Sequence, residues 1–220
     1  MADFAAEREK MVRQQIAGRG IEGARLLDAF RAVPRELFVP DGVREFAYED
    51  GPLPIEAGQT ISQPYIVALM IEAAGISPGD KVLEIGAGSG YAAAVMSRVA
   101  GEVIAVERHP ELAGLARGRM ERLGYGNVRI VDGDGTGGLP GEAPFRAILC
   151  AASGSHVPEA LSRQLAVGGI LVMPLGEPEA VQKLVKVTRR GEHEFDREDL
   201  GPVRFVPLIG AHGWTDPRGD

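Results

Sequence analysis

The sequence predicts an α/β fold, a doubly wound and mostly parallel sheet with N-terminal helices and an antiparallel C-terminal β extension. Between residues 64 and 175, apolar strand-like runs alternate with segments of helical periodicity, as in parallel sheets with right-handed crossovers. After residue 176 the helical periodicity stops and strand-like segments follow one another. We expect a single domain, 1–220, made of three regions (1–63, 64–175 and 176–220).

The first region, 1–63, is expected to hold two helices and a long loop. Residues 4–17 carry apolar side chains at helical spacing and are followed by glycines that favour a helix end. Residues 22–32 predict a second helix, which stops before a proline. Residues 48–63 are irregular and rich in Gly and Pro, and a loop of this length inside a compact domain is usually functional.

The second region predicts the parallel sheet and its crossover helices. Pro64 suits the first turn of the first of these helices. We expect helices at 64–74, 90–100, 110–123 and 158–166, and strands at 81–85, 102–107, 128–131, 146–151 and 169–174.

The third region predicts β structure only. Residues 181–189 and 193–199 form a pair of strands that turns at Gly191, and residues 202–209 form a third strand. The basic pair Arg189-Arg190 would then lie at a hairpin tip.

A glycine-rich turn follows the first strand of the core. The run Val82-Leu83-Glu84-Ile85-Gly86-Ala87-Gly88 continues into Ser89-Gly90, so an acid precedes three closely spaced glycines. Glycines let backbone N–H groups and a helix N-terminus approach a bound cofactor closely. A plain strand-to-helix connection needs fewer glycines, so we interpret this turn as a cofactor site.

The acid Glu107 ends the second strand of the core, where α/β cofactor folds place a carboxylate on ribose hydroxyls. The alternative is a solvated strand-end carboxylate. The glycine spacing, G-x-G-x-G, is one residue short of the dinucleotide pattern, which disfavours a nicotinamide oxidoreductase. It resembles instead the class I S-adenosylmethionine-dependent methyltransferases, with a Rossmann-like fold, S-adenosyl-L-methionine as cofactor and S-adenosyl-L-homocysteine as product.

A second glycine motif, Gly133-Asp134-Gly135, follows the third strand. It is either a turn with two residues at positive φ or a carboxylate and backbone placed beside the adenine ring. We favour the second interpretation.

Two apparent motifs carry no chemistry. Gly75-Ile76-Ser77-Pro78-Gly79 matches the G-x-S-x-G of serine hydrolases, but here a helix precedes the serine and a strand follows it, the reverse of a nucleophile elbow. The four histidines are scattered and the one cysteine, Cys150, lies in an apolar strand, so we expect no metal site.

Trp214 either anchors the C-terminal tail by packing or lines the cofactor pocket.

Composition excludes some partners. The net charge of −7 and the lack of any basic cluster beyond Arg189-Arg190 argue against a nucleic-acid substrate. No stretch has the roughly eighteen apolar residues of a membrane helix, and residues 1–10 lack the apolar run of a signal peptide. We expect no membrane partner and a cytoplasmic location.

Five segments together resemble a single family. They are Val33-Pro34-Arg35-Glu36-Leu37-Phe38-Val39, Gly58-Gln59-Thr60-Ile61-Ser62-Gln63-Pro64, Val82–Gly90, Gly133-Asp134-Gly135 and Val203-Arg204-Phe205-Val206-Pro207-Leu208. The chain, from about Met11 to Trp214, is similar to protein-L-isoaspartate O-methyltransferases. The resemblance implies a repair enzyme that methylates the α-carboxylate of L-isoaspartyl residues in damaged proteins and peptides. The ester would collapse to a succinimide and return some normal aspartate, and the resemblance also implies a monomer.

The resemblance implies roles for residues in three parts of the chain. Ser62 matches the catalytic hydroxyl. The cofactor contacts fall on Thr60, Ile61, Glu84, Gly86, Ala87, Gly88, Ser89, Gly90, Glu107, Arg108, Asp134 and Gly135. The substrate contacts fall on Ile61, Ser62, Val203, Arg204, Phe205, Val206 and Leu208.

Two departures from the family pattern stand out. The segment 152–158 replaces a common Ala-Pro step, and Arg146 stands where an acid is usual. Two alternative functions remain open at this point: a methyltransferase with another acceptor, and a non-catalytic module that binds S-adenosylmethionine. The Ser62 loop disfavours the second, because a pure binder needs no acceptor site.

Overall fold

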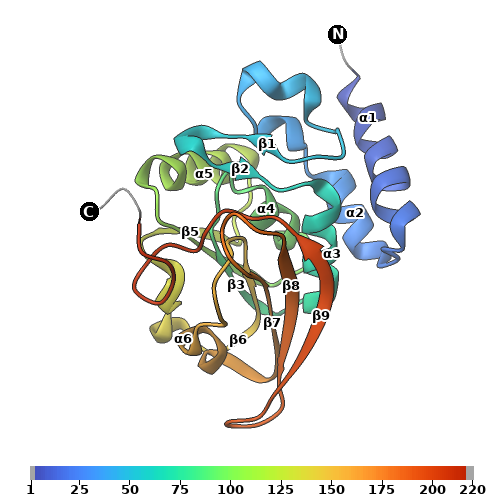
Figure 1. The fold of residues 1–220 in the computed structure, drawn as a ribbon. Helices are drawn as coiled ribbons and strands as arrows, with labels where there is room; N and C mark the ends of the chain where they lie inside the picture. The colour runs from blue at the N-terminus through green and yellow to red at the C-terminus, as the bar shows by residue number, and fades with distance from the viewer. Residues whose placement is uncertain (1–2, 217–220) are drawn as a thin grey trace.

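A single seven-stranded sheet organises the molecule in the computed structural model, which describes residues 3–216 (Figure 1). The strands lie in the order β5-β4-β3-β6-β7-β8-β9, and β1 and β2 form a separate antiparallel pair. Their bounds are β1 Leu53–Pro54, β2 Thr60–Ile61, β3 Lys81–Ile85, β4 Glu102–Glu107, β5 Val128–Asp132, β6 Phe145–Cys150, β7 Leu165–Leu175, β8 Gln182–Arg189 and β9 Phe195–Val203.

Helices cover both faces of the sheet, because the strands of the parallel part are apolar on both sides. On one face, α3, α4 and α5 share a buried core with the N-terminal helices; on the other, α6 packs against alternate residues of the same strands, such as Leu83 and Ile148. The helix bounds are α1 Phe4–Lys10, α2 Ala24–Ala32, α3 Pro64–Ala74, α4 Tyr91–Ser97, α5 Pro110–Leu123 and α6 Glu159–Arg163. No helix within residues 3–216 has the length and apolar character needed to cross a membrane.

The strand order reverses at β3. The chain runs outward from β3 through β4 to β5, then returns to place β6 on the other side of β3, all in parallel. In open α/β sheets this switch point opens a crevice outside the carboxyl ends of the strands. The glycine-rich turn leaves β3 at this position, as the sequence predicts.

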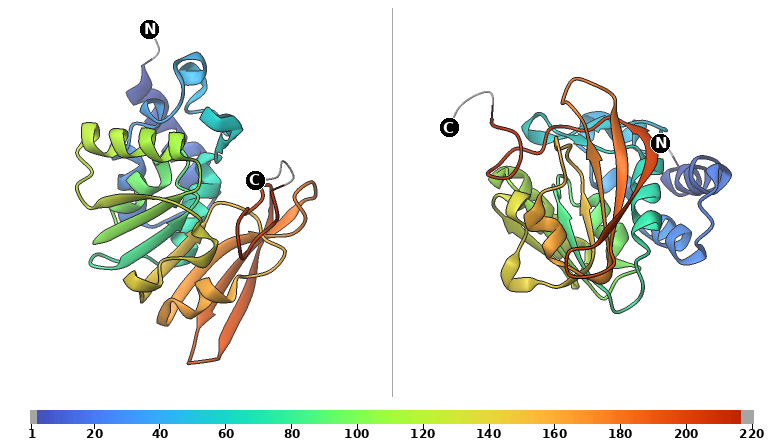
Figure 2. Two further views of the ribbon diagram at one scale, coloured as in Figure 1. Left: turned by 90° about the vertical axis from the view of Figure 1, so that its left-hand side faces the viewer. Right: turned by 60° about the horizontal axis from the view of Figure 1, so that its bottom comes forward.

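The C-terminal hairpin restores the parallel direction. Strand β8 runs antiparallel to β7, and β9 runs antiparallel to β8, so β9 points the same way as the parallel strands. The carboxyl end of β9, Val203, pairs with Gln182 and lies at the same edge as the end of β7, Leu175. Figure 2 shows the hairpin (orange) extending away from the N-terminal helices (blue), with its tip at the opposite edge.

The predicted helix 158–166 is shorter than expected. Helix α6 ends at Arg163, and β7 starts at Leu165, where it pairs with Phe145 of β6. The N–H of Phe145 donates to the carbonyl of Gln164 at 2.8 Å, so sheet pairing begins one residue after the helix. Gly168, at φ +78°, lies in the irregular part of β7, which the sequence prediction placed outside the strand.

The predicted strands 193–199 and 202–209 were wrongly divided. A single strand, β9, covers 195–203, and the chain then leaves the sheet, because its partner β8 begins only at Gln182. The side-chain amide of Gln182 replaces the missing strand: it accepts from the N–H of Phe205 at 2.7 Å and donates to its carbonyl at 3.1 Å. Residues 204–209 are therefore free to form a wall instead of a strand.

The N-terminal helix also differs in detail from the prediction. Residues 4–17 are helical, but α1 changes at Met11 into a π-helical turn that ends at Ile16. That turn buries Met11, Val12 and Ile16, which are among the apolar side chains at helical spacing in residues 4–17. The hairpin tip behaves as predicted, since Arg190 donates its N–H to the carbonyl of Glu194 across the turn.

Candidate active site

A cavity of about 690 Å³ lies at the carboxyl ends of β3 and β4. Three segments form most of its wall: the loop 57–63, the glycine turn after β3, and the tail after β9. The predicted site residues in this wall are Thr60, Ile61, Ser62, Glu84, Gly86, Ala87, Gly88, Ser89, Glu107, Arg108, Gly135, Val203, Arg204, Phe205, Val206 and Leu208. The structure thus brings together segments that are more than a hundred residues apart in the chain.

The glycine turn folds against the end of β4. Gly86 and Gly88 have φ of +86° and +54°, in the left-handed region that glycine tolerates best. The N–H groups of Gly86 and Ala87 donate to the carbonyl of Val106 at 2.8 and 3.1 Å, which pins the turn to the neighbouring strand.

Both oxygens of the buried Glu107 accept backbone hydrogen bonds. Oε2 accepts from the N–H of Gly88 at 2.8 Å, and Oε1 accepts from the N–H of His109 at 3.0 Å. The acid is thereby fixed at the junction of the glycine turn and the loop after β4. Each carboxylate oxygen has a second lone pair, so this fixed acid retains acceptors for a ligand in the cavity.

Glu84 is the most unusual acid in the wall. Its side chain is buried, and among residues 3–216 its Oε2 has no hydrogen-bond partner. Burial, and secondarily the charge of Glu107, raise the pKa of Glu84 well above its ordinary value. These two neighbouring acids, one with an oxygen that has no partner, fit a ligand that carries positive charge. A cation would offset both the cost of burying the Glu84 charge and the repulsion between the two carboxylates.

The loop 57–63 is anchored at both ends. At its start, Oε1 of Glu56 meets the guanidinium of Arg119 at 3.4 Å, and Arg119 also donates to the carbonyl of Ser89 at 3.2 Å. At its end, the carbonyl of Ser62 accepts from Nη2 of the buried Arg35 at 2.8 Å. The half-buried Ser62 is therefore held on a loop that is tied both to the glycine turn and to the core.

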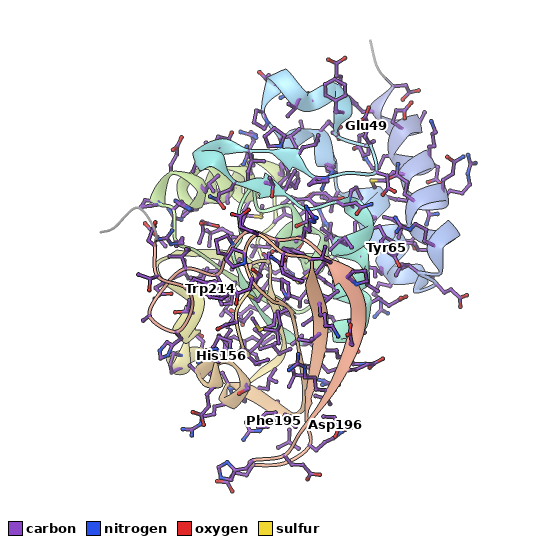
Figure 3. All side chains as sticks on the ribbon, viewed as in Figure 1. Glu49, Tyr65, His156, Phe195, Asp196 and Trp214 are labelled. Carbon is purple, nitrogen blue, oxygen red and sulfur yellow. The ribbon has the colours of Figure 1, made fainter. Side chains whose placement is uncertain are left out.

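The tail after β9 is held by Ser153, which belongs to the segment 152–158, the first of the two departures from the family pattern. The N–H of Ser153 donates to the carbonyl of Val206 at 2.8 Å, and the N–H of Leu208 donates back to the carbonyl of Ser153 at 2.8 Å. Trp214 adds a third bond, from its indole Nε1–H to the same Ser153 carbonyl at 2.8 Å. This bond anchors the tail at Trp214, which Figure 3 labels. Trp214 is not among the residues of the cavity wall.

Two predicted cofactor residues, Gly90 and Asp134, do not line the cavity. A Cβ atom on Gly90 would lie 2.8 Å from Cε of Met120 and 3.3 Å from Cβ of Ala116, so its small size serves helix packing. Burial acts to raise the pKa of Asp134, but hydrogen bonds from Ala211 and Thr136 outweigh it and keep that pKa below its ordinary value.

Several residues in or behind the wall were not predicted. Tyr91, at the start of α4, lines the cavity, and burial raises its pKa to about 12, so it stays protonated. His109 and Asp216 also line it, and Oδ2 of Asp216 meets Nη2 of Arg108 at 3.2 Å. The position of Tyr91 directly after the glycine turn was an available signal, whereas nothing local marks Asp216.

The remaining reactive side chains form no second centre. Within residues 3–216, no group of three or more His, Cys, Asp or Glu side chains could hold a metal ion. Cys150 is buried in the core, as predicted, and burial raises its pKa to about 12. The second departure, Arg146, donates from its guanidinium to the carbonyl of Gly168 and so supports β7 rather than the cavity.

Residues 6–213 match the model of one protein family, described as protein-L-isoaspartate(D-aspartate) O-methyltransferase. Protein-L-isoaspartate O-methyltransferase 1 of Rhodopseudomonas palustris strain HaA2 is 53% identical, over 99% of this chain and 90% of that protein. A protein-L-isoaspartate O-methyltransferase of strain CGA009 is 56% identical, over 94% of this chain and 95% of that protein.

Two solved structures are similar over most of the chain. A protein-L-isoaspartate O-methyltransferase superposes with a TM-score of 0.86 at 33% identity, covering 94% of this chain and 67% of that one. A Plasmodium falciparum protein described as a putative protein-L-isoaspartate O-methyltransferase, in complex with S-adenosyl-L-homocysteine, gives a TM-score of 0.78 at 26% identity, covering 92% and 98%.

Proposed function

The chain belongs to the protein-L-isoaspartate(D-aspartate) O-methyltransferase family, and on that premise we propose how its cavity binds cofactor and substrate. The enzyme transfers a methyl group from S-adenosyl-L-methionine to the α-carboxylate of L-isoaspartyl residues in damaged proteins and peptides. The methyl ester then closes to a succinimide, whose hydrolysis returns normal aspartate in part.

The cofactor fits the glycine-turn end of the cavity. The sulfonium and ammonium groups of S-adenosyl-L-methionine are cations, and the buried Glu84 has an oxygen with no partner in the described chain. Glu107, fixed by Gly88 and His109, is placed to accept from ribose hydroxyls. Gly86, Gly88 and Gly135 allow the backbone to approach closely, while Gly90 and Asp134 act from behind the wall.

The substrate fits the other end, between the loop 57–63 and the tail after β9. We assign Ser62 to hold the α-carboxylate and assign the tail residues 203–208 as the wall of the peptide groove. When bound, S-adenosyl-L-methionine supplies a methyl group on sulfur; a carboxylate oxygen forms the new C–O bond as the S–C bond breaks.

No proton transfer is needed for this reaction, because a carboxylate with an ordinary pKa near 4 is already ionised at pH 7. Tyr91 keeps its proton and cannot compete as a base. The chain therefore contributes position and exclusion of water. A neutral hydroxyl such as that of Ser62 can align the anion without stabilising it so strongly that attack is slowed.

The observation that carries this proposal is the placement of Ser62 and the Glu84–Glu107 pair in one cavity. The test is transfer of labelled methyl from S-adenosyl-L-methionine to two peptides that differ only in isoaspartate or aspartate at one position. Base-labile label on the isoaspartyl peptide alone is expected. Label on neither peptide, with cofactor binding intact, would mean that the enzyme methylates a different acceptor. The segment 152–158, which departs from the family pattern, would then be the first place to look for the cause.

The net charge of −7 supports the absence of a nucleic-acid partner. The monomeric state and the cytoplasmic location stay predictions, which sedimentation and fractionation would check.

A further inference from the structure

Arg35 is a fully buried cation without a carboxylate partner. Its exposed fraction is 0%, and none of the ion pairs within residues 3–216 includes it. The neighbouring acid in the chain, Glu36, is instead engaged by Arg8 at 3.2 Å and by the hydroxyl of Tyr48. A buried charge is costly unless it is compensated, so an uncompensated arginine invites a functional explanation.

The guanidinium is held by backbone carbonyls and an aromatic ring. Nε donates to the carbonyl of Ala47 and Nη2 to the carbonyl of Ser62, each at 2.8 Å, and the guanidinium carbon lies 4.7 Å from the centroid of the Tyr91 ring. Tyr91 and Ser62 both line the cavity, whereas Arg35 does not. The positive charge is thus placed directly behind the acceptor end of the wall.

The bond to Ser62 fixes the orientation of a peptide group. In a planar trans peptide the C=O and the following N–H point in opposite directions. Because the Ser62 carbonyl points to Arg35, the N–H of Gln63 points away from Arg35, and Ser62 and Gln63 are both residues of the cavity wall. Within residues 3–216 that N–H donates to no other group, so it is available to an incoming acceptor.

The same cavity carries negative charge that would oppose a carboxylate. Glu107 is buried in its wall, and the buried Glu84 beside it, protonated in the free protein, becomes a second negative charge when a cation binds. Of its arginines, Arg108 is paired with Asp216 and Arg204 is exposed to solvent. Arg35 lies behind Ser62 at the other end of the cavity, where its charge offsets those of the two acids for an incoming carboxylate.

We propose that Arg35 is a positioning residue of the acceptor site: it turns the Gln63 N–H toward the cavity and supplies the buried positive charge that favours a carboxylate over a neutral group beside Ser62. This inference rests on the proposed function, since it assumes that the substrate presents an α-carboxylate there. It accounts for selection of the ionised acceptor by a site that otherwise holds acids.

The test compares two peptides bound to the enzyme loaded with S-adenosyl-L-homocysteine. One carries isoaspartate, and the other carries the same residue with its α-carboxylate converted to a carboxamide. Arg35→Met removes the charge and both hydrogen bonds at similar volume, and Arg35→Lys keeps the charge. Arg8→Met is the matched control, because Arg8 contacts Glu36 and Tyr48 in the same region but does not contact Ser62.

In Arg35→Met we expect the affinity for the carboxylate peptide to fall about tenfold or more, as for a unit charge lost at a distance of several ångströms in a partly buried site. The affinity for the carboxamide peptide should change less than threefold. Arg35→Lys should retain most of the preference, and Arg8→Met should lower the melting temperature while leaving the preference unchanged.

A merely structural arginine would lower both affinities by the same factor in Arg35→Met, and that result would overturn the inference. If Arg35→Met does not fold, Arg35→Gln takes its place as the neutral variant, with the same two criteria. Equal binding of both peptides by the unchanged enzyme would overturn the proposed acceptor site itself, which separates its failure from that of the role of Arg35.

Discussion

The carboxylate of Asp134 holds the N–H of Ala211, 77 residues further along the chain, at 2.8 Å. Its other oxygen accepts from the N–H of Thr136, also at 2.8 Å, and the hydroxyl of Thr136 accepts from the N–H of His212 at 3.0 Å. The loop after β5 is therefore the dock for the C-terminal tail. The acid that the sequence suggests for adenine also holds the segment that follows the substrate wall.

Replacement of Asp134 by alanine should loosen that tail. Amide protons of residues 210–214 should exchange faster by hydrogen-exchange mass spectrometry, and cofactor affinity should fall several-fold because the wall at Leu208 is less fixed. The lowered pKa of Asp134 means that its contribution is present above the ordinary aspartate pKa and is lost as the pH falls through the lowered value. Unchanged exchange at pH 7 would contradict this role.

Two glycines in one turn should respond differently to alanine. Gly90→Ala should destabilise the fold by about 1–3 kcal/mol, because φ is +86° and a Cβ would meet Met120 at 2.8 Å. Cofactor affinity of the folded fraction should stay within threefold. Gly88→Ala changes a residue of the cavity wall at φ +54°, where a side chain strains the backbone, and its Cβ would lie 3.5 Å from Cδ1 of Ile55; it should weaken cofactor binding about tenfold. Calorimetry and denaturant titration of both variants check this contrast.

Ser62→Ala should lower kcat for the isoaspartyl peptide by about 10- to 100-fold while leaving S-adenosyl-L-methionine binding within threefold, as expected when only substrate alignment is lost. Ser77→Ala is the control, since this exposed serine before β3 lies outside the cavity. Equal losses of turnover and of cofactor binding in Ser62→Ala would remove Ser62 from the acceptor site.

Cofactor affinity should rise with pH. The raised pKa of Glu84 favours its protonated form in the free protein, and a bound cation favours the ionised form, so binding releases a proton. Calorimetry in buffers of different ionisation enthalpy should detect this release. Glu84→Gln should bind more weakly and lose the release. A proton count that Glu84→Gln leaves unaltered would assign the effect to another group.

The parallel core follows from its sequence because its signals are local. The apolar runs that become β3 and β4, and the acids that end them, need only neighbouring residues to be recognised. The segment 202–209 shows where local signals fail: it has strand composition, but it leaves the sheet after Val203 because its partner β8 begins only at Gln182. Strand propensity says nothing about whether a partner strand is present.

In the candidate site too, the residues in local sequence motifs could be predicted, and those that depend on tertiary contacts could not. Ser62 and the glycine turn belong to contiguous motifs, so their positions in the cavity wall could be anticipated. The burial of Arg35 behind Ser62 and the pairing of Asp134 with Ala211 depend on tertiary contacts that no spacing encodes. A glycine at position 90 can be required either by a bound ligand or by the packing of helices, and the glycine motif alone does not tell these two causes apart.

The chain reverses direction twice from β7 through β8 to β9, so the number of strands after β7 decides at which edge of the sheet the tail emerges. One extra or missing strand would deliver the tail to the opposite edge of the sheet. That edge is roughly 30 Å from the cavity for a nine-residue strand. Only changes by an even number of strands keep residues 203–208 beside Ser62, so insertions that preserve activity should occur as whole hairpins.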